Sequence, residues 1–308
     1  MSTAYITHPD CLLHDTGAGH PECADRLRAI DAQLTAAPPD PLLRHYPAPE
    51  ATREQLLRIH DADYLEWLES KIPTSGHTYL DPDTPVSPDS LRAARRAAGA
   101  VIRGVDLVLG GEVDNAFCAV RPPGHHAERH RAMGFCLYGN LAAGAAHALE
   151  QHGLERVAIL DFDVHLGNGT EQIFRNDPRV LICNTHQAPL YPNVPCGGRG
   201  AASVCAPLPA GAGADEFRQA VERHWLPAVD AFAPQLILVS AGFDAHREET
   251  LAGLRLGSSD YRWVSERIVE LAARHAAGRI VSALEGGYAL TALGRCALTH
   301  LRVLMGLD

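Results

Sequence analysis

Short apolar runs alternate with longer amphipathic segments along most of the 308 residues. The runs have the length and composition of strands at residues 3–7, 115–121, 157–163, 180–185, 236–241 and 279–284. Helical segments are predicted at residues 23–36, 52–70 (one or two helices), 88–109, 140–152, 214–233, 259–277 and 290–305, with a Pro-rich connector at 38–49. Strands alternating with helices indicate βαβ units and a mostly parallel sheet covered on both faces. No composition shift or long linker divides the pattern, so we predict one α/β domain over residues 1–308.

Composition excludes several classes of protein. No stretch is long and apolar enough to span a bilayer, and the first residues lack the regions of a signal peptide. The net charge of −10 argues against binding nucleic-acid phosphates and suits cationic substrates. Only one of the 27 basic residues is a lysine, which leaves almost no candidate for a Schiff base or a phosphate-loop lysine. The eight cysteines are scattered without a Cys-x-x-Cys pair, which predicts reduced thiols and a cytoplasmic location.

Two carboxylates and an imidazole converge where the apolar run at 157–160 ends. On an extended chain Asp161, Asp163 and His165 share one face, and Leu166 lies on the other. No lysine or arginine between residues 157 and 174 neutralises these groups. Aspartate oxygen and histidine nitrogen are zinc ligands, so the stretch is a candidate metal site. A lone Asp-x-His is more often a helix cap followed by a surface histidine, and only the rest of the chain favours the metal.

Three other predicted strands also end in polar residues. After 115–121 come His125 and His126, after 236–241 comes Asp244, and after 279–284 come Glu285 and Tyr288. In a parallel sheet, ligands bind beyond the carboxyl ends of the strands. Four strand ends that carry such side chains indicate an active site, although each residue alone has a structural alternative.

The ordered motifs Pro-Pro-Gly-His125-His126, Asp161-Phe-Asp163-Val-His165, Ser240-Ala-Gly-Phe-Asp244 and Glu285-Gly-Gly-Tyr288 resemble those of the zinc-dependent histone deacetylase family. The closest likeness is to its bacterial, class II-like members, and it extends over nearly the whole chain. The resemblance implies an arginase/deacetylase fold with a central, mostly parallel sheet of about eight strands flanked by helices.

The resemblance also assigns roles around the metal. It implies one zinc ion per chain on Asp163, His165 and Asp244, with a position left open for water and substrate. His126 would be the general base and acid, oriented by Asn168. His125 would pair with Asp161 and remain cationic. Tyr288 would donate its hydroxyl to the substrate carbonyl.

Further residues are implied around the substrate. Phe135 matches one wall of an acyl-lysine channel, with Gly134 supplying a carbonyl, and Tyr191 lies in the segment that would form the opposite wall. Gly286, before Tyr288, favours close backbone approach. Arg26 resembles an arginine near an inner cavity, although a surface helix arginine is nearly as good an interpretation. A structural potassium ion is implied at residues 161–165 with Asn184 or Thr185.

The chain departs from the family pattern at three places. Leu166 replaces a histidine common after the metal-binding one. The turn at residues 191–199 and the segment 247–250 also differ, and these changes bear on substrate choice more than on chemistry. Asp81 and Asp83, in a Pro-rich loop, are candidates for the rim.

Two competing functions remain after this comparison. A two-manganese ureohydrolase would need a carboxylate two residues after His165, where Gly167 stands. A catalytically silent binding protein should have lost a ligand, a tandem histidine or Tyr288, and none is missing. If the protein is an enzyme, three substrates stay open: an acylated lysine peptide, an acetylpolyamine or another acylated amine. A homo-oligomer stays open too, and the Arg-heavy composition fits a bacterial source.

Overall fold

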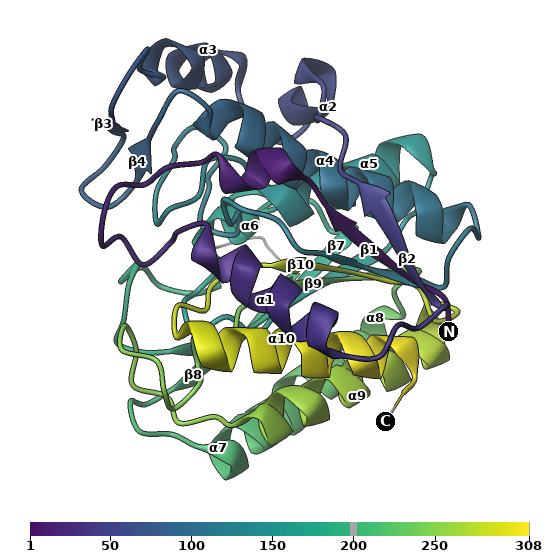
Figure 1. The fold of residues 1–308 in the computed structure, drawn as a ribbon. Helices are drawn as coiled ribbons and strands as arrows, with labels where there is room; N and C mark the ends of the chain where they lie inside the picture. Colours follow the sequence, from purple (N-terminus) through teal and green to yellow (C-terminus); the bar gives the residue numbers. More distant parts are fainter. Residues whose placement is uncertain (198–201, 308) are drawn as a thin grey trace.

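Eight strands form one sheet in which every neighbouring pair runs parallel. The computed structural model describes residues 1–197 and 202–307. The order across the sheet is β2-β1-β5-β10-β9-β6-β7-β8 (Figure 1). The bounds are β1 Thr3–Thr7, β2 Leu43–Pro47, β5 Asn115–Cys118, β6 Val157–Asp161, β7 Val180–Gln187, β8 Ala202–Leu208, β9 Leu236–Ala241 and β10 Ile280–Leu284. A short antiparallel pair, β3 Thr78–Tyr79 and β4 Pro85–Val86, stands apart from this sheet.

The predicted apolar runs account for six of these eight strands, and the two that they missed lie at the edges of the sheet. β2 falls inside the predicted connector 38–49, and that prediction is wrong for residues 43–47. Each residue of β2 is at least partly exposed, so the strand carries no apolar run. β8 contains Pro207, which an edge strand tolerates because one side of its backbone needs no partner. Edge strands are therefore the ones that hydrophobic patterning misses.

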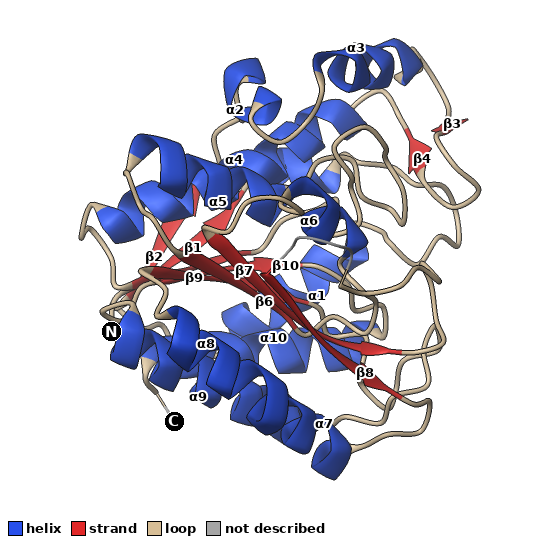
Figure 2. Ribbon diagram, turned by 180° about the vertical axis from the view of Figure 1, so that it is seen from behind, coloured by secondary structure: helices blue, strands red, loops and turns tan. Residues whose placement is uncertain are grey.

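Helices cover both faces of the sheet (Figure 2). α4 and α5 pack on one face, and α1, α8, α9 and α10 pack on the other. The bounds are α1 Asp25–Ala36, α2 Arg53–Leu57, α3 Ala62–Lys71, α4 Ser90–Leu109, α5 Asn140–Gln151, α6 Asn168–Ile173, α7 Ala214–Ala220, α8 Leu226–Phe232, α9 Ser258–His275 and α10 Leu290–Met305. The predicted α/β class with both faces covered is confirmed.

Two predicted helices are subdivided. The segment 52–70 folds as α2 and α3, because Asp61 begins a new helix after a break. The segment 214–233 folds as α7 and α8, joined by a π-helical turn at Val221–Trp225. Helical periodicity located both segments. The two helices of the first segment agree with one of the two alternatives predicted for residues 52–70, whereas the π-helical turn in the second segment was not predicted.

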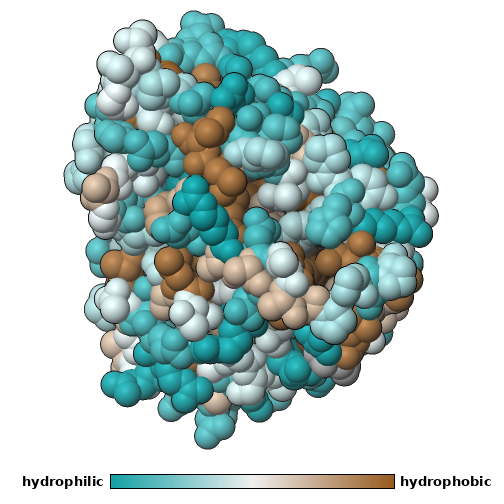
Figure 3. Space-filling view, viewed as in Figure 1, coloured by the Kyte–Doolittle hydropathy of each residue, from teal (hydrophilic) through white to brown (hydrophobic). Residues whose placement is uncertain are grey.

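The surface is mostly polar on the side shown in Figure 3, where apolar residues reach the surface in separate patches. Among the described residues, no helix is both long enough and apolar enough to cross a membrane.

Candidate active site

The polar residues that follow four strands come together because those strands are neighbours. β5, β10, β9 and β6 are adjacent in the sheet, and β7 comes next. All of them run parallel, so their carboxyl ends meet at one edge. The segments after these ends carry, in strand order, the tandem histidines, Tyr288, Asp244 and the Asp163–His165 pair. Hydrogen bonds join the segments to one another.

Glu285 holds the turn that presents the tandem histidines. Its Oε2 accepts hydrogen bonds from the backbone N–H groups of Gly124 (2.7 Å) and His125 (3.1 Å). The side chain is fully buried, and burial raises the pKa of Glu285 to about 7. Sequence reasoning gave Glu285 no role. Its position directly after β10 and before two glycines was the available signal.

His125 lies among carboxylates. Its Nδ1 is 3.0 Å from Asp161 Oδ2, and its Nε2 is 3.7 Å from Asp163 Oδ1. Burial opposes the charged ring, but Asp163 and Asp161 together raise the pKa of His125 well above its ordinary value. The two carboxylates therefore favour the protonated, cationic form of His125.

His126, the next residue, has the opposite electrostatic setting. Burial lowers the pKa of His126 well below its ordinary value, and the positive rings of His125 and His165 lower it further. Its Nδ1 lies 2.8 Å from Asn168 Oδ1, and Asn168 Nδ2 in turn donates to Glu128 Oε1 (2.9 Å). Because the amide oxygen accepts, Nδ1 carries the ring proton and Nε2 keeps a lone pair. The surroundings of His126 therefore favour a neutral ring in one tautomer.

Asp163, His165 and Asp244 form a compact group of possible metal ligands. One donor atom from each lies within 4.8 Å of the others. His165 Nδ1 is 3.0 Å from Asp163 Oδ1 and 3.2 Å from Asp244 Oδ2. Both carboxylates are fully buried. Gly286 N–H donates to Asp163 Oδ2 (2.7 Å) and Val164 N–H donates to Asp244 Oδ1 (2.9 Å), which fixes both side chains.

This group fits a divalent cation. Asp244 Oδ2 is buried and accepts no hydrogen bond from any of the described residues, because a single imidazole proton cannot serve two carboxylates. Burial and the nearby Asp163 raise the pKa of Asp244 to about 6. Burial opposes a charge on His165, yet Asp163 and Asp244 raise the pKa of His165 to about 10. Both shifts show a site that favours added positive charge. Two carboxylates and an imidazole are the donor set that zinc accepts.

Tyr288 is positioned by two buried charged residues. Glu249 Oε2 accepts from the backbone N–H of Tyr288 (2.7 Å) and of Ala289 (3.0 Å). Arg26 donates to the carbonyl oxygens of Gly287 (2.7 Å) and Glu285, and its guanidinium lies 4.9 Å from the Tyr288 ring centroid. Arg26 is fully buried, so the surface-helix interpretation is wrong. Glu249 belongs to the unusual segment 247–250, and sequence reasoning missed its role.

Aromatic rings surround the tandem histidines and Tyr288. The Phe135 ring lies 5.8 Å from the Tyr288 ring, and the Tyr191 ring lies 5.1 Å from that of His126. Gly134 has a positive φ of 54°, and a Cβ there would collide with the His126 ring, so the position requires glycine. The structure therefore brings Gly134, Phe135 and Tyr191 to the side of the histidines. The last residues of the unusual turn, 198 and 199, lie outside the described residues.

The loop that carries Asp81 and Asp83 lies next to these rings. Phe135 N–H donates to Thr84 Oγ1 (3.1 Å), and His20 contacts the Asp83 carbonyl oxygen (3.2 Å). Burial and the neighbouring Asp81 raise the pKa of Asp83 to about 6. Burial raises the pKa of Tyr191 too, and the two aspartates add to the rise. The acidic loop is therefore part of the same region.

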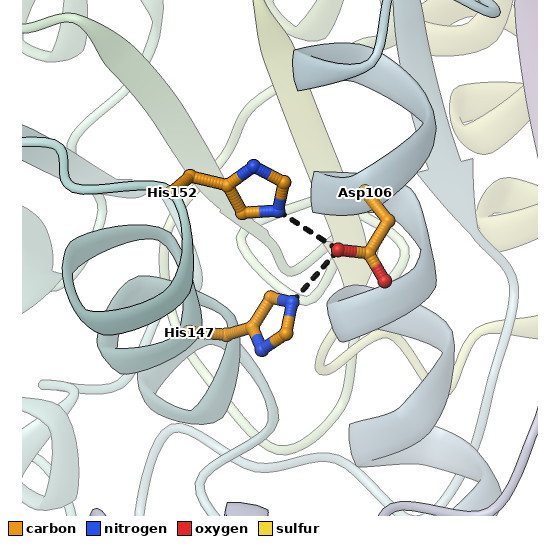
Figure 4. A group of neighbouring side chains, drawn as sticks. All are labelled: Asp106, His147 and His152. Carbon is orange, nitrogen blue, oxygen red and sulfur yellow. Dashed lines mark hydrogen bonds and ion pairs between the residues drawn. The ribbon is translucent and has the colours of Figure 1, made fainter.

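A second group of histidines lies between α4 and α5 (Figure 4). The Nε2 atoms of His147 and His152 lie 2.7 and 2.8 Å from Asp106 Oδ1. Arg58 donates to His147 Nδ1 (3.1 Å), so that ring carries its proton on Nε2 and donates it to Asp106. No lone pair of His147 is left for a metal, and the group is satisfied as a chain of hydrogen bonds.

The prediction of reduced cysteines is wrong for one pair. Cys196 and Cys205 form a disulfide, while the other six cysteines are free and five of those are buried. The pair escaped sequence analysis because its residues are nine apart without a recognised motif, and the fold alone brings them together.

Comparisons with known proteins agree with the geometry. A family model described as histone deacetylase domain matches residues 20–304. A "Histone deacetylase-like amidohydrolase" of Pseudomonas aeruginosa is 40% identical, covering 99% of this chain and 86% of the relative. A "Probable deacetylase" of Archaeoglobus fulgidus is 38% identical over 94% of this chain and 82% of its own. The crystal structure of an HDA15 HD domain superposes with a TM-score of 0.92 at 34% identity, covering 99% of this chain and 88% of that one. The predicted arginase/deacetylase fold is confirmed.

Proposed function

The chain belongs to the histone deacetylase family, and from that premise we propose that it is a zinc-dependent hydrolase of acyl amides. It would remove the acyl group from an acylated lysine side chain or a related acylated amine. One observation carries the proposal: a buried group of metal-ligand type lies beside a neutral histidine whose Nε2 is free to take a proton.

Asp163, His165 and Asp244 would hold one zinc ion per chain. When bound, zinc supplies a Lewis acid that polarises the amide carbonyl and makes a water molecule acidic enough to attack it. The protein fixes the two carboxylate ligands through the backbone donors of Gly286 and Val164.

The tandem histidines would divide the proton chemistry between them. His126 takes a proton from the attacking water at Nε2 and returns it to the departing amine. Asn168 orients the ring without adding a negative charge, while burial and the positive rings of His125 and His165 keep the pKa of His126 low. His125, paired with Asp161, keeps its proton and stabilises the negative charge that develops nearby.

Tyr288 would donate its hydroxyl to the amide carbonyl oxygen as that atom gains charge. Glu249 and Arg26 position the loop for this contact. Phe135 and Tyr191 would form the walls around the acyl-lysine methylenes. Gly134 would offer its carbonyl to the substrate N–H, and Gly286 would allow close approach of the backbone.

A potassium ion is proposed beneath the zinc group. Asp161 pairs with Asn184 on β7 and with Ser240 on β9 in the register of the sheet. Ser240 Oγ and the neighbouring Thr185 Oγ1 are buried without a hydrogen-bond partner. Oxygen donors of this kind suit a hard cation, which supports a structural role for potassium bound by the backbone of residues 161–165 with Thr185 or Asn184.

Substrate class is inferred from charge. The net charge of −10 and the acidic loop with Asp81 and Asp83 favour a cationic substrate, either an acylated lysine peptide or an acetylated polyamine. The same charge disfavours nucleic acid as a partner. Retention of the three ligands, both tandem histidines and Tyr288 argues against a silent binding protein. A cytoplasmic location is proposed because six of the eight cysteines are free.

Side-by-side assays of an acetyl-lysine peptide, acetylputrescine and acetylspermidine test the proposal. We expect hydrolysis of at least one, loss of the rate after treatment with a chelator, and recovery with zinc. An undiminished rate in metal-free protein would contradict zinc dependence. Selective hydrolysis of the two polyamines would favour the small-molecule alternative.

A further inference from the structure

The Cys196–Cys205 disulfide lies in an accessible part of the molecule next to the candidate active site. Cys205 belongs to the edge strand β8, and Cys196 follows Tyr191 by five residues. Both cysteines are partly exposed, whereas five of the six free cysteines are buried. A reagent that exchanges thiols with disulfides can therefore reach this pair from solvent.

A buried carboxyl faces the two sulfurs. Glu171 Oε1 lies 3.1 Å from Cys196 Sγ and 3.8 Å from Cys205 Sγ. Ser203 Oγ and Asn184 Nδ2 also contact this oxygen, and burial raises the pKa of Glu171. A disulfide has no proton to donate, whereas a thiol has one. Reduction thus supplies Glu171 with another donor, which stabilises the dithiol form and makes the bond reducible.

Two structural connections join the pair to the tandem histidines. Glu171 lies on α6, which begins at Asn168. The side-chain oxygen of Asn168 accepts the hydrogen bond from His126 Nδ1. On the other side, the Tyr191 ring contacts that of His126. A cavity of about 270 Å³ has Asn168, Glu171, Val194 and Pro195 among its lining residues, so the segment before Cys196 lies against α6. The disulfide therefore fastens the segment that follows Tyr191 to the sheet.

We propose that Cys196 and Cys205 are a site of reversible thiol–disulfide exchange that controls the Tyr191 side of the substrate channel. The consequence for the channel rests on the proposed function. A thiolate of an external dithiol attacks one sulfur, forms a mixed disulfide and releases the other cysteine. The second thiol of the reagent then displaces the mixed disulfide. The reagent gives up two electrons and two protons and becomes a disulfide, and the protein gains two thiols.

Reduction removes the covalent tie between β8 and the segment after Tyr191. The ligands Asp163, His165 and Asp244 and the tandem histidines are untouched, so kcat should change little. The segment that carries Tyr191 must instead become ordered when substrate binds. This ordering costs free energy and therefore raises KM. Cys205→Ser and Cys196→Ser remove the tie permanently and should behave as the reduced form under all conditions.

The test combines thiol counting with kinetics. Alkylation followed by mass spectrometry should count six thiols in oxidised protein and eight after dithiothreitol. KM for the hydrolysed amide should be about threefold or more higher in the reduced form, as expected for one additional ordering step on binding. Cys23→Ser, the matched control at the partly exposed free cysteine, should retain the response, and Cys205→Ser should lose it. Because Cys205→Ser has no disulfide to reduce, any change that dithiothreitol causes in this variant reports its effect on the metal.

A second readout does not depend on activity. Hydrogen exchange of residues 189–195 should be faster in the reduced form, and Glu171→Gln should shift the equilibrium with dithiothreitol toward the disulfide. Eight thiols under oxidising conditions, or equal KM and equal exchange in both forms, would overturn the proposal. If no acyl amide is hydrolysed at all, the proposed function fails, while the exchange measurement still decides for or against the switch.

Discussion

Two groups of histidines and aspartates in this protein use the same side chains for different purposes. In the group Asp163, His165 and Asp244, two fully buried carboxylates share one imidazole, and Asp244 Oδ2 accepts no hydrogen bond from the described part of the chain. In the group Asp106, His147 and His152, two imidazoles donate to one carboxylate that is 38% exposed. The first group has more carboxylate oxygens than N–H donors. In the second group the carboxylate oxygen accepts from both imidazoles.

The contrast shows that residue type and proximity do not define a metal site. Arg58 donates to the remaining nitrogen of His147, whereas the ion-pair partners of Asp163 and Asp244 among the described residues are histidines. Buried carboxylates with too few hydrogen-bond donors favour the binding of a cation. A carboxylate that is partly exposed to solvent and accepts hydrogen bonds is already stabilised and does not need one. The deciding quantity is thus the unsatisfied negative charge.

The largest expected difference is in activity. Asp244→Asn should lower kcat/KM at least about a thousandfold, because a lost ligand removes several kcal/mol of transition-state stabilisation. Asp106→Asn should change it less than about twofold, since the exposed pair is satisfied without a metal. Steady-state kinetics and zinc content of both variants provide the measurement. A comparable loss of kcat/KM in the two variants would contradict the conclusion that only the group with Asp244 binds a catalytic metal.

Tyr288→Phe separates chemistry from metal binding at the buried group. The variant should bind zinc normally and turn over about a hundredfold more slowly, because one donor to the developing oxyanion is lost. Metal analysis and kcat are measured on the same preparation. Full activity with an acetyl substrate would mean that Tyr288 serves only in packing.

Leu166→His adds a histidine next to the buried group. Leu166 is 2% exposed and follows a strand that ends at Asp161, and the three existing ligands complete the group without it. Turnover should therefore change less than about tenfold, with one zinc per chain before and after. Little zinc in the wild type, restored by the new histidine, would show that the group needs a fourth protein ligand.

The smallest effect concerns stability at the exposed group. His147 and His152 lower the pKa of Asp106 against the opposing effect of partial burial. A lowered folded-state pKa gives stability that is present above the ordinary aspartate value of about 3.9 and is lost as pH falls below it. Urea unfolding should give Asp106→Asn a free energy of unfolding less than about 1 kcal/mol below that of the wild type at pH 7, and the gap should close as the pH falls below about 4. If the difference in unfolding free energy widened on acidification, the pKa of Asp106 would be raised by folding and not lowered.

Much of the site was predictable because its motifs are local. The candidate metal ligands, the tandem histidines and Tyr288 each follow an apolar run, and in the structure each follows a strand of the central sheet. Glu285 and Glu249 were missed because their partners are backbone N–H groups of distant segments, and a sequence does not show which backbone groups lie nearby. Edge strand β2 was missed because its side chains are exposed on a polar surface.

The sequence by itself determined the α/β class, most strands and helices, and which residues could carry the chemistry, since hydrophobic periodicity and short motifs are properties of neighbouring residues. Only the tertiary structure decided that β5, β10, β9 and β6 are adjacent, because strand order depends on how the connecting helices pack. It also decided that the pKa of His125 is raised and the pKa of His126 is lowered, although the two are consecutive. Their protonation depends on burial and on charges from β6 and the segments beyond it, which are brought near only by folding.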